Sequence, residues 1–189
     1  MLFGSSGIRQ EFGPGLVDLA LRIGAAAADG ASPLVVGRDT RTTSELLEHC
    51  VVAGMLSAGA AVYTCGIAPT PTVAYATRRA DAGCMITASH NPEPYNGVKL
   101  LNPDGSSFTR RQQAAIEEAL EGTHRVGWEE QGHTSPIDAL AMHRDAILGE
   151  ISLSRPVTVV LDCGNGAGSV ITPDLLSDAG ATVVGLNCN

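Results

Sequence analysis

The sequence predicts an α/β protein with one complete domain and part of a second. Short apolar runs alternate along the chain with segments whose apolar residues recur at helical spacing, which is typical of a parallel sheet covered by helices. The chain has 189 residues, 44% of them hydrophobic, enough for one packed core and part of another. We expect the complete domain over residues 1–152 and the start of the second over 153–189.

The first half of the chain contains the clearest of these alternating segments. Residues 33–37 are expected to form a short buried strand that ends at a glycine. Leucine, valine and methionine then recur on one side of residues 43–58, which predicts a helix with Ser44 as its N-cap. We expect further strands at 60–65, 83–87 and 98–101 and further helices at 72–79 and 109–120, the last one capped by Thr109.

The second half is more polar and ends in a separate unit. Residues 122–135 are polar and contain glycine, as surface loops do, and 136–151 are expected to form a helix with Pro136 in its first turn. One βαβ unit is only half of a usual doubly wound domain, so we expect a truncated second domain. After Pro156 its order is a strand at 157–161, a turn at 162–168, a helix at 172–179 and a strand at 182–186.

Charge and composition exclude several classes of protein. The formal net charge is −8, and residues 101–189 carry most of it, with five Lys and Arg against twelve Asp and Glu. Nucleic-acid-binding proteins need a basic face against phosphates, so we expect no nucleic-acid partner. No run of about 18 apolar residues is present and the N-terminus lacks a secretory pattern, so we expect no membrane partner and a cytoplasmic location.

Neither the cysteines nor the histidines have the spacing of a metal site. The five cysteines are widely separated, form no CxxC pair and fall within or beside apolar runs, which predicts buried, reduced thiols. The five histidines form no HxxxH or HExxH pair. A zinc enzyme is therefore not expected.

The residue types that catalysis needs gather between positions 86 and 99. The string Ile-Thr-Ala-Ser-His-Asn-Pro (86–92) follows a predicted strand, and Asn-Gly-Val-Lys (96–99) contains the single lysine of the chain, Lys99. Asn96 and Gly97 are typical of a turn, which would bring Lys99 back toward the serine hydroxyl. A polar turn with an incidental serine is the alternative interpretation.

Two kinds of nucleophilic serine can be compared at this position. In a Ser–His hydrolase the histidine accepts the serine proton, but Ser89 and His90 are neighbours whose side chains point apart in an extended loop, and no GxSxG elbow is present. A serine that accepts and returns a phosphoryl group fits better, because phosphoserine carries about −1.5 to −2 charges that need cations nearby. Lys99 could supply one cation. An arginine from another loop could supply a second, and the candidates in this half of the chain are Arg9, Arg38 and Arg41.

Five motifs occur in a fixed order along the chain. They are Phe3-Gly-Ser-Ser-Gly-Ile-Arg9, Val36-Gly-Arg-Asp-Thr-Arg41, Gly66-Ile-Ala-Pro-Thr-Pro71, Thr87-Ala-Ser-His-Asn-Pro92 with Asn96-Gly-Val-Lys99, and Asp162-Cys-Gly-Asn-Gly-Ala-Gly168. These motifs resemble those of the α-D-phosphohexomutases, the family of phosphoglucomutase, phosphomannomutase and phosphoglucosamine mutase, and the resemblance covers residues 2–187. It implies a three-layer α/β/α first domain, the phosphoserine domain, followed by the first βαβ unit of a second domain.

The resemblance implies an activity, the interconversion of hexose 6-phosphate and hexose 1-phosphate. Ser89 would be a phosphoserine that donates its phosphoryl group to the hexose phosphate and takes the other group back from the resulting hexose bisphosphate. That bisphosphate also serves as the activating primer, and one Mg²⁺ would bind the phosphate on Ser89. The opening motif is most similar to the phosphoglucosamine mutase and phosphomannomutase branches.

The same resemblance assigns roles to the neighbours of Ser89. His90 and Lys99 would contact the phosphate and assist proton transfer, as the family's residues at these motif positions do. Arg9 matches the active-site arginine of the first loop, and Asn91 would orient the serine loop. The remaining matches, which would bind phosphate or substrate or support those that do, are Ser5 and Arg38.

Two further motifs have simpler interpretations. Arg38, Asp39 and Arg41 could form an active-site network, but an ion-pair cluster that supports the serine loop is favoured over it. Residues 164–168 are similar to a dinucleotide-binding GxGxxG loop, yet Ser169 stands where the third glycine is needed. We therefore interpret 164–168 as structural.

The sequence departs from the family pattern in two respects. Gln10 follows Arg9 where the family usually has glycine, and the family's Asp-Gly-Asp-x-Asp-Arg metal loop does not occur in these 189 residues. Family members have four domains and more than twice this length. We therefore expect this chain alone to be inactive. The alternative is a non-catalytic α/β module that binds a sugar phosphate or another protein.

Overall fold

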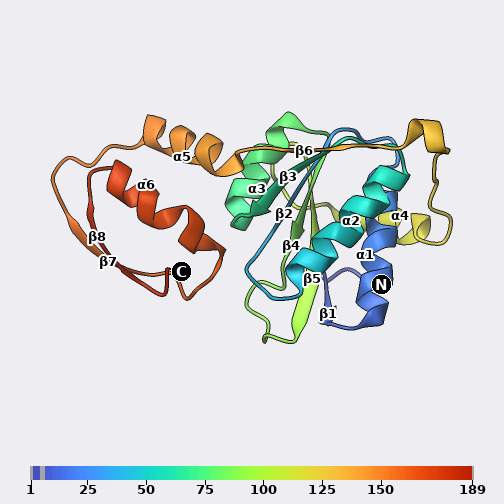
Figure 1. Ribbon diagram of the computed structural model, residues 1–189, viewed down its shortest axis with the longest axis horizontal. Helices are drawn as coiled ribbons and strands as arrows, with labels where there is room; N and C mark the ends of the chain where they lie inside the picture. The colour runs from blue at the N-terminus through green and yellow to red at the C-terminus, as the bar shows by residue number, and fades with distance from the viewer. Residues whose placement is uncertain (1, 5–6, 189) are drawn as a thin grey trace.

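The computed structural model describes residues 2–4 and 7–188 and contains a six-stranded and a two-stranded sheet (Figure 1). In the larger sheet β2, β3, β4 and β6 are parallel, β5 is antiparallel to β4, and β1 is antiparallel to β5. The carboxyl ends of the parallel strands therefore share one edge, which we call the carboxyl edge. In spatial order the strands are β1 (Ile8–Glu11), β5 (Tyr95–Leu101), β4 (Ala82–Ile86), β2 (Leu34–Arg38), β3 (Val62–Ile67) and β6 (Thr134–Pro136).

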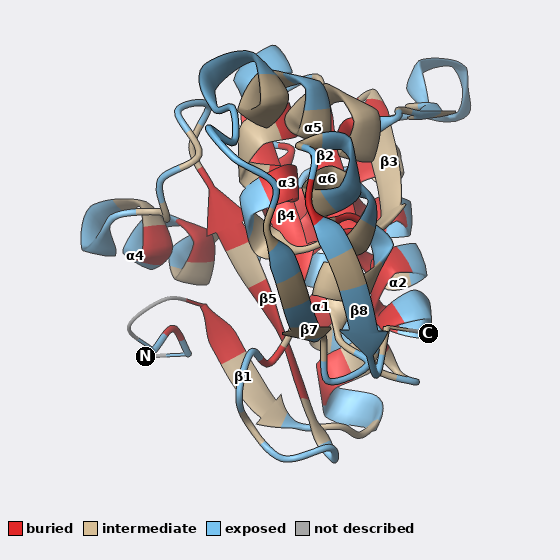
Figure 2. Cartoon of the chain, turned by 90° about the vertical axis from the view of Figure 1, so that its left-hand side faces the viewer, coloured by how far each residue is buried: buried red, intermediate tan, exposed pale blue. Residues whose placement is uncertain are grey.

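Helices cover both faces of this sheet. One face packs on α1 (Pro14–Ala27), α2 (Ser44–Ser57) and α4 (Arg110–Ala119) around a core of Leu, Ile, Val and Ala side chains. The other face packs on α3 (Thr70–Ala76) and α5 (Ala139–Glu150) around a smaller core. The predicted three-layer α/β/α architecture is confirmed, and Figure 2 shows the buried residues concentrated in its central strands.

Helices α1 and α2 approach each other closely at two glycines. A Cβ atom at Gly24 would collide with the carbonyl oxygen of Val51, and one at Gly54 would collide with that of Leu21. The missing side chains let the two helix backbones touch, so each helix brings its neighbouring Leu, Ile and Val residues onto the sheet.

The two-stranded sheet belongs to a smaller second unit. Strands β7 (Thr158–Asp162) and β8 (Thr182–Leu186) are parallel and are joined through the 3₁₀ turn η3 (Ala167–Val170) and helix α6 (Thr172–Asp178). Large apolar side chains of this sheet face solvent: Val160 is 68% exposed and Val184 is 49% exposed. Figure 2 shows β7 and β8 mostly in the colours of exposed and intermediate residues. The predicted boundary between 152 and 153 falls in the segment that connects α5 to β7.

Most predicted elements are present, with three corrections. Pro136 ends strand β6 instead of starting a helix; α5 begins at Ala139, and the carboxylate of Asp138 caps it by accepting a hydrogen bond from the Ala141 amide at 2.9 Å. The predicted loop 122–135 contains a short 3₁₀ turn, η2 (Trp128–Glu130), and the start of β6. Thr43, not Ser44, is the residue before α2.

Two further predictions concern the burial of the cysteines and the absence of a membrane-spanning segment. All five cysteines are free, but only Cys84 is buried; the expectation of burial is wrong for the other four, which are partly exposed. Within the described residues, every helix is too short or too polar to cross a membrane.

Candidate active site

The serine loop, residues 87–94, connects β4 to β5 at the carboxyl edge of the large sheet. Ser89 is exposed at its tip with φ of +58°, in the left-handed region that non-glycine residues rarely occupy. The Ser89 amide donates a hydrogen bond to Oγ1 of Thr87 at 2.9 Å. A strained residue of this kind persists only where its surroundings hold it, and such residues cluster at functional sites.

The side chain of Arg41 provides that support. Its guanidinium forms an ion pair with Asp39 at 3.3 Å and is 15% exposed. It also donates hydrogen bonds of 2.7–3.4 Å to five carbonyl oxygens, those of Ser89, Asn91, Pro92, Glu93 and Tyr95. The predicted ion-pair cluster that supports the serine loop is therefore confirmed for Asp39 and Arg41. A single guanidinium thus fixes the loop backbone at Ser89 and over the residues that follow it, as far as Tyr95.

A buried polar network extends this support into the sheet. Asn96 is completely buried, and its side-chain amide donates to the hydroxyls of Thr43 at 2.9 Å and Ser44 at 2.8 Å. The Ser44 hydroxyl in turn donates to Asp39 at 2.5 Å. Three segments are thus connected: β5, the start of α2 and the loop that carries Arg41.

This network corrects the prediction of a turn at Asn96 and Gly97. Both residues lie within β5, and the chain reverses earlier, where the Tyr95 amide donates to the Pro92 carbonyl at 3.0 Å. Gly97 serves a different purpose, because a Cβ atom there would collide with the carbonyl oxygen of Ile8 on β1. The glycine allows β1 to pair closely with β5.

That pairing places Arg9 and Lys99 on one face of the sheet. Arg9 pairs with Gly97, and Lys99 follows two residues later on β5, so both side chains project from the same face. Arg9 Nη1 also donates to Oδ1 of Asn91 at 3.4 Å, which connects the first strand to the serine loop. The structure thus brings Ser89, Asn91, Arg9 and Arg41 together and puts Lys99 beside Arg9.

Arg38 is placed differently. It pairs in register with Ile86, on the sheet face covered by α2, and its guanidinium contacts Glu48 at 2.9 Å and Glu45 at 3.7 Å. Burial raises the pKa of Glu48, and the attraction of Arg38 opposes that increase. Of the two roles open to Arg38, the geometry favours support of the fold over contact with phosphate.

His90, Ser5 and the expected Mg²⁺ are the remaining predictions for this site. His90 is exposed next to Ser89 at the loop tip, and Ser5 lies outside the described residues. The carboxylate of Asp39 is already engaged by Arg41 and Ser44. Across residues 2–4 and 7–188 no three His, Cys, Asp or Glu side chains are grouped as a metal site would need. These residues therefore do not fit a Mg²⁺ site of their own, and we derive no step through the metal.

The hollow in front of Ser89 is shared between the two units. It has a volume of about 440 Å³. The Thr40 hydroxyl donates to the carbonyl oxygen of Asn165 at 2.9 Å, which fixes the turn after β7 against the loop after β2. The interpretation of 164–168 as structural missed this contact with the pocket. The lining residues are Asp39, Thr40, Arg41, Thr42, Ser89, Glu93 and Asn165.

The turn that carries Asn165 has its own support. Asn165 has φ of +51°, and the exposed carboxylate of Asp162 accepts hydrogen bonds from Nδ2 of Asn187 and from the Gly164 amide, both at 2.9 Å. These bonds lower the pKa of Asp162. The carboxylate thereby connects the ends of β7 and β8.

Comparison with known proteins agrees with this arrangement. Residues 1–126 match the family described as phosphoglucomutase/phosphomannomutase, alpha/beta/alpha domain I. A protein of Methanocella arvoryzae named "Probable phosphoglucosamine mutase" is 47% identical over 98% of this chain and 43% of its own length. The phosphoglucosamine mutase of Methanococcus aeolicus is 42% identical over 98% of this chain and 42% of its own length.

A solved structure shows the same fold. The phosphoglucomutase/phosphomannomutase family protein of Burkholderia thailandensis superimposes with a TM-score of 0.89 and 29% identity, over all of this chain and 44% of the other. The chain thus spans less than half the length of the relatives it matches. By sequence and by structure, this chain belongs to the phosphoglucomutase/phosphomannomutase family.

Proposed function

We propose that this chain forms the serine-bearing part of a phosphohexomutase. Such an enzyme interconverts hexose 6-phosphate and hexose 1-phosphate through a phosphoserine and a hexose bisphosphate. The observation that carries the proposal is the display of Ser89, exposed at positive φ on a loop whose carbonyls are bonded by Arg41. Phosphoryl transfer depends mainly on positioning and on charge neutralisation, and this loop supplies the positioning.

The proposed step transfers the phosphoryl group from Oγ of Ser89 to a hydroxyl of the hexose phosphate. The hydroxyl oxygen forms the new bond to phosphorus while the bond from phosphorus to Oγ breaks. The hydroxyl proton leaves through His90 or Lys99, and Oγ takes up one proton to become the serine hydroxyl again. Arg9 and Lys99, on one face of the sheet, would neutralise part of the phosphate charge. Asn91 would hold Arg9 against the loop through their hydrogen bond.

The identity of the hexose and the other components are also proposals. Two relatives carry the name phosphoglucosamine mutase, which favours glucosamine phosphate over mannose or glucose phosphate. Mg²⁺ would bind the phosphate on Ser89 together with ligands from outside the described residues, and a hexose bisphosphate would phosphorylate the serine initially. Five free cysteines suit a reducing compartment, so we place the protein in the cytoplasm.

Mass spectrometry after incubation with a hexose bisphosphate tests the proposal. In the complete enzyme we expect one phosphoryl group on the peptide that contains Ser89, and Ser89→Ala should reduce turnover by at least about a thousandfold. Ser106→Ala and Ser107→Ala are matched controls on the loop after β5, and they should keep turnover. Phosphate on Ser106 or Ser107 instead would refute the assignment.

The 189-residue chain alone distinguishes an enzyme part from a binding module. We expect no turnover of hexose 1-phosphate by this chain, because its described residues offer no metal site. Turnover at even about 0.1 per second would show that further segments are dispensable. Binding of hexose phosphate without any phosphorylation of Ser89 in the complete enzyme would favour the non-catalytic module.

A further inference from the structure

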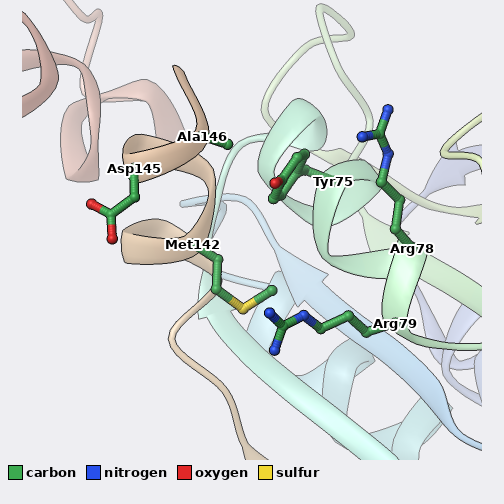
Figure 3. A pocket seen from close by; sticks show the side chains of 6 residues that line it. All are labelled: Tyr75, Arg78, Arg79, Met142, Asp145 and Ala146. Atoms are coloured by element: carbon green, nitrogen blue, oxygen red, sulfur yellow. The ribbon is translucent and has the colours of Figure 1, made fainter. Parts of the chain in front are cut away.

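A second pocket lies away from the serine loop, between α5 and the end of α3 with its 3₁₀ extension η1 (Thr77–Arg79) (Figure 3). It has a volume of about 370 Å³. Because η1 precedes β4 and the serine loop follows it, the length of β4 separates this pocket from Ser89. The lining residues are Tyr75, Arg78, Arg79, Met142, Asp145 and Ala146.

Two adjacent arginines give this pocket a positive charge in a chain whose net charge is −8. Arg78 and Arg79 are both exposed, and within the described ranges no carboxylate lies within 4.0 Å of either guanidinium. Figure 3 shows the two guanidinium groups pointing in different directions, so an anion beside Arg79 would be stabilised mainly by that arginine and more weakly by Arg78. Surface arginines that only solubilise a protein are more often interspersed with acids.

The acidic residues nearby are turned to other partners. The carboxylate of Asp145, which lines the pocket, lies 3.8 Å from Arg144 Nε, and Figure 3 shows it on the side of α5 away from the two pocket arginines. Asp104 accepts a hydrogen bond from the Ser106 amide at 2.9 Å. Hydrogen bonds from Ser106 lower the pKa of Asp104, and Arg78 adds a weaker attraction. Asp145 lines the same pocket as Arg79, but the described residues contain no ion pair between them within 4.0 Å.

An aromatic stack fixes one wall of the pocket. The rings of Tyr75 and His143 stack with centroids 5.3 Å apart, and Cζ of Arg78 lies 5.2 Å from the centroid of Tyr75. A hydrogen bond of 2.9 Å between Thr72 Oγ1 and His143 Nδ1 holds the histidine. Figure 3 shows the Arg79 guanidinium pointing toward Met142 on α5. Side chains that are already ordered lose little freedom when a ligand binds.

We propose that this pocket binds the phosphate group of a small phosphorylated molecule. Arg79, which has no carboxylate within 4.0 Å among the described residues, supplies the main charge, and the planar guanidinium can bind two oxygens of one phosphate group. Arg79 and the Tyr75 hydroxyl offer hydrogen-bond donors to the phosphate oxygens, and Arg78 adds charge. Met142 and Ala146 provide an apolar wall for the carbon part, and the volume is within the range of small-molecule sites. The site is independent of the chemistry at Ser89.

Titration of the 189-residue chain with inorganic phosphate, followed by NMR, tests the proposal. We expect saturable shifts of the Arg78 and Arg79 Nε–H signals and of Tyr75. Arg79→Gln should weaken phosphate binding at this pocket at least tenfold while the circular dichroism spectrum stays unchanged. Arg125→Gln is the matched control, because Arg125 is an exposed arginine on the loop after α4, and it should leave the affinity unchanged.

Further arms separate this pocket from the serine site and identify the ligand. Lys99→Met should leave the shifts of Arg78 and Arg79 intact, even if the proposed function of Ser89 is wrong. A hexose 6-phosphate that binds more tightly than inorganic phosphate would assign the carbon part to the Met142 wall, and equal affinity would limit recognition to the phosphate. Shifts confined to the serine loop, or unchanged affinity in Arg79→Gln, would overturn the proposal. If that variant is unfolded, unchanged affinity in Arg78→Gln would overturn it instead.

Discussion

The serine loop and the turn of residues 162–166 have similar backbones but different supports. Each follows the carboxyl end of a parallel strand, and each holds a non-glycine residue at positive φ, +58° at Ser89 and +51° at Asn165. The strand before the serine loop, β4, is buried at every position, whereas β7 alternates between exposed and half-buried residues. The guanidinium that holds the first loop is mostly buried, and the Asp162 carboxylate that holds the second is exposed.

This difference indicates which of the two turns is rigid. Hydrogen bonds from a charged group gain strength where water is excluded and lose it where water competes. Arg41 makes five such bonds behind the serine loop, while Asp162 makes two at the surface. Asparagine also tolerates the left-handed region better than serine, so the turn at Asn165 needs less support. We conclude that the loop around Ser89 is held firmly, and that the turn around Asn165 in the second unit is held weakly.

Removal of Arg41 should have the largest effect on this contrast. Arg41→Met removes the guanidinium that donates to five carbonyls and pairs with the Asp39 carboxylate, so we expect the free energy of unfolding to fall by about 3 kcal/mol. In the complete enzyme, turnover should fall by about 10²–10³ because Ser89 loses its fixed position. Chemical denaturation and steady-state kinetics measure the two effects. Arg125→Met, on an exposed loop, should change stability by less than about 0.5 kcal/mol, and an equally small change in Arg41→Met would contradict the proposed support.

Hydrogen exchange should separate the two units without any substitution. Amides of β4 lie in the core of the six-stranded sheet, and those of β7 and β8 lie in a two-stranded sheet with exposed Val160 and Val184. A two-stranded sheet is marginally stable by itself. We expect amides of β7 and β8 in this chain to exchange about a thousandfold faster than those of β4, or ~4 kcal/mol in opening free energy. Equal protection would show that the units unfold together.

The sequence predicted the architecture well because its signals were periodic. The buried strand predicted at 33–37, the helix predicted at 43–58 and the cap predicted at Thr109 are all present, with bounds shifted by one or two residues. The first strand and α1, in contrast, were not predicted at all, although Pro14 at the start of α1 is a usual helix signal. Pro136 was assigned to a helix although it ends strand β6. Proline is accepted both in the first turn of a helix and in an edge strand such as β6, so its presence alone does not distinguish the two.

The site was predicted less completely, because its support comes from residues far apart in sequence. The string around Ser89 singled out a serine that the structure exposes at a loop tip, and its reactivity stays a prediction. Asn96, in contrast, was interpreted as a turn residue, whereas it is buried and donates hydrogen bonds to Thr43 and Ser44. The contact of Thr40 with Asn165 joins residues 125 positions apart, and no local pattern predicts it. The Asn-Gly pair predicts a turn only where neither residue is needed inside a strand. Here Gly97 is needed inside β5, because β1 approaches it too closely for a side chain.

The ion pair of Arg38 should show a pH-dependent contribution to stability. Burial raises the pKa of Glu48, so this carboxyl stays protonated to higher pH in the folded state than in the unfolded state. Low pH therefore favours the folded state at this residue. Arg38→Met removes the attraction that opposes this shift, and we expect about 2 kcal/mol of lost stability at neutral pH. The deficit should shrink as pH falls toward the ordinary glutamate pKa of 4.5, because Glu48 becomes neutral.

Denaturation of Arg38→Met at several pH values measures this dependence. The double variant Arg38→Met with Glu48→Gln is the control, because it has no Glu48 carboxylate to titrate, and its deficit relative to Glu48→Gln alone should not vary with pH in this range. A deficit in the single variant that stays constant down to pH 4.5 would mean that Glu48 is not the group responsible.

The contact between the two turns should have the smallest effect. Thr40→Val keeps the shape of the side chain and removes the hydroxyl that donates to the Asn165 carbonyl. Thr40 is exposed, so water replaces the lost bond and the cost should be at most about 1 kcal/mol, or up to fivefold in turnover of the complete enzyme. Thr42 lines the same hollow, so Thr42→Val is the matched control, and we expect it to leave turnover unchanged. We also expect Thr40→Val to raise the hydrogen-exchange rate of the Asn165 amide and to leave that of the Ser89 amide unchanged. This result would show that the turn of residues 162–166 is the less rigid of the two. A loss of turnover in Thr40→Val as large as that in Arg41→Met would contradict the difference in support between the two turns.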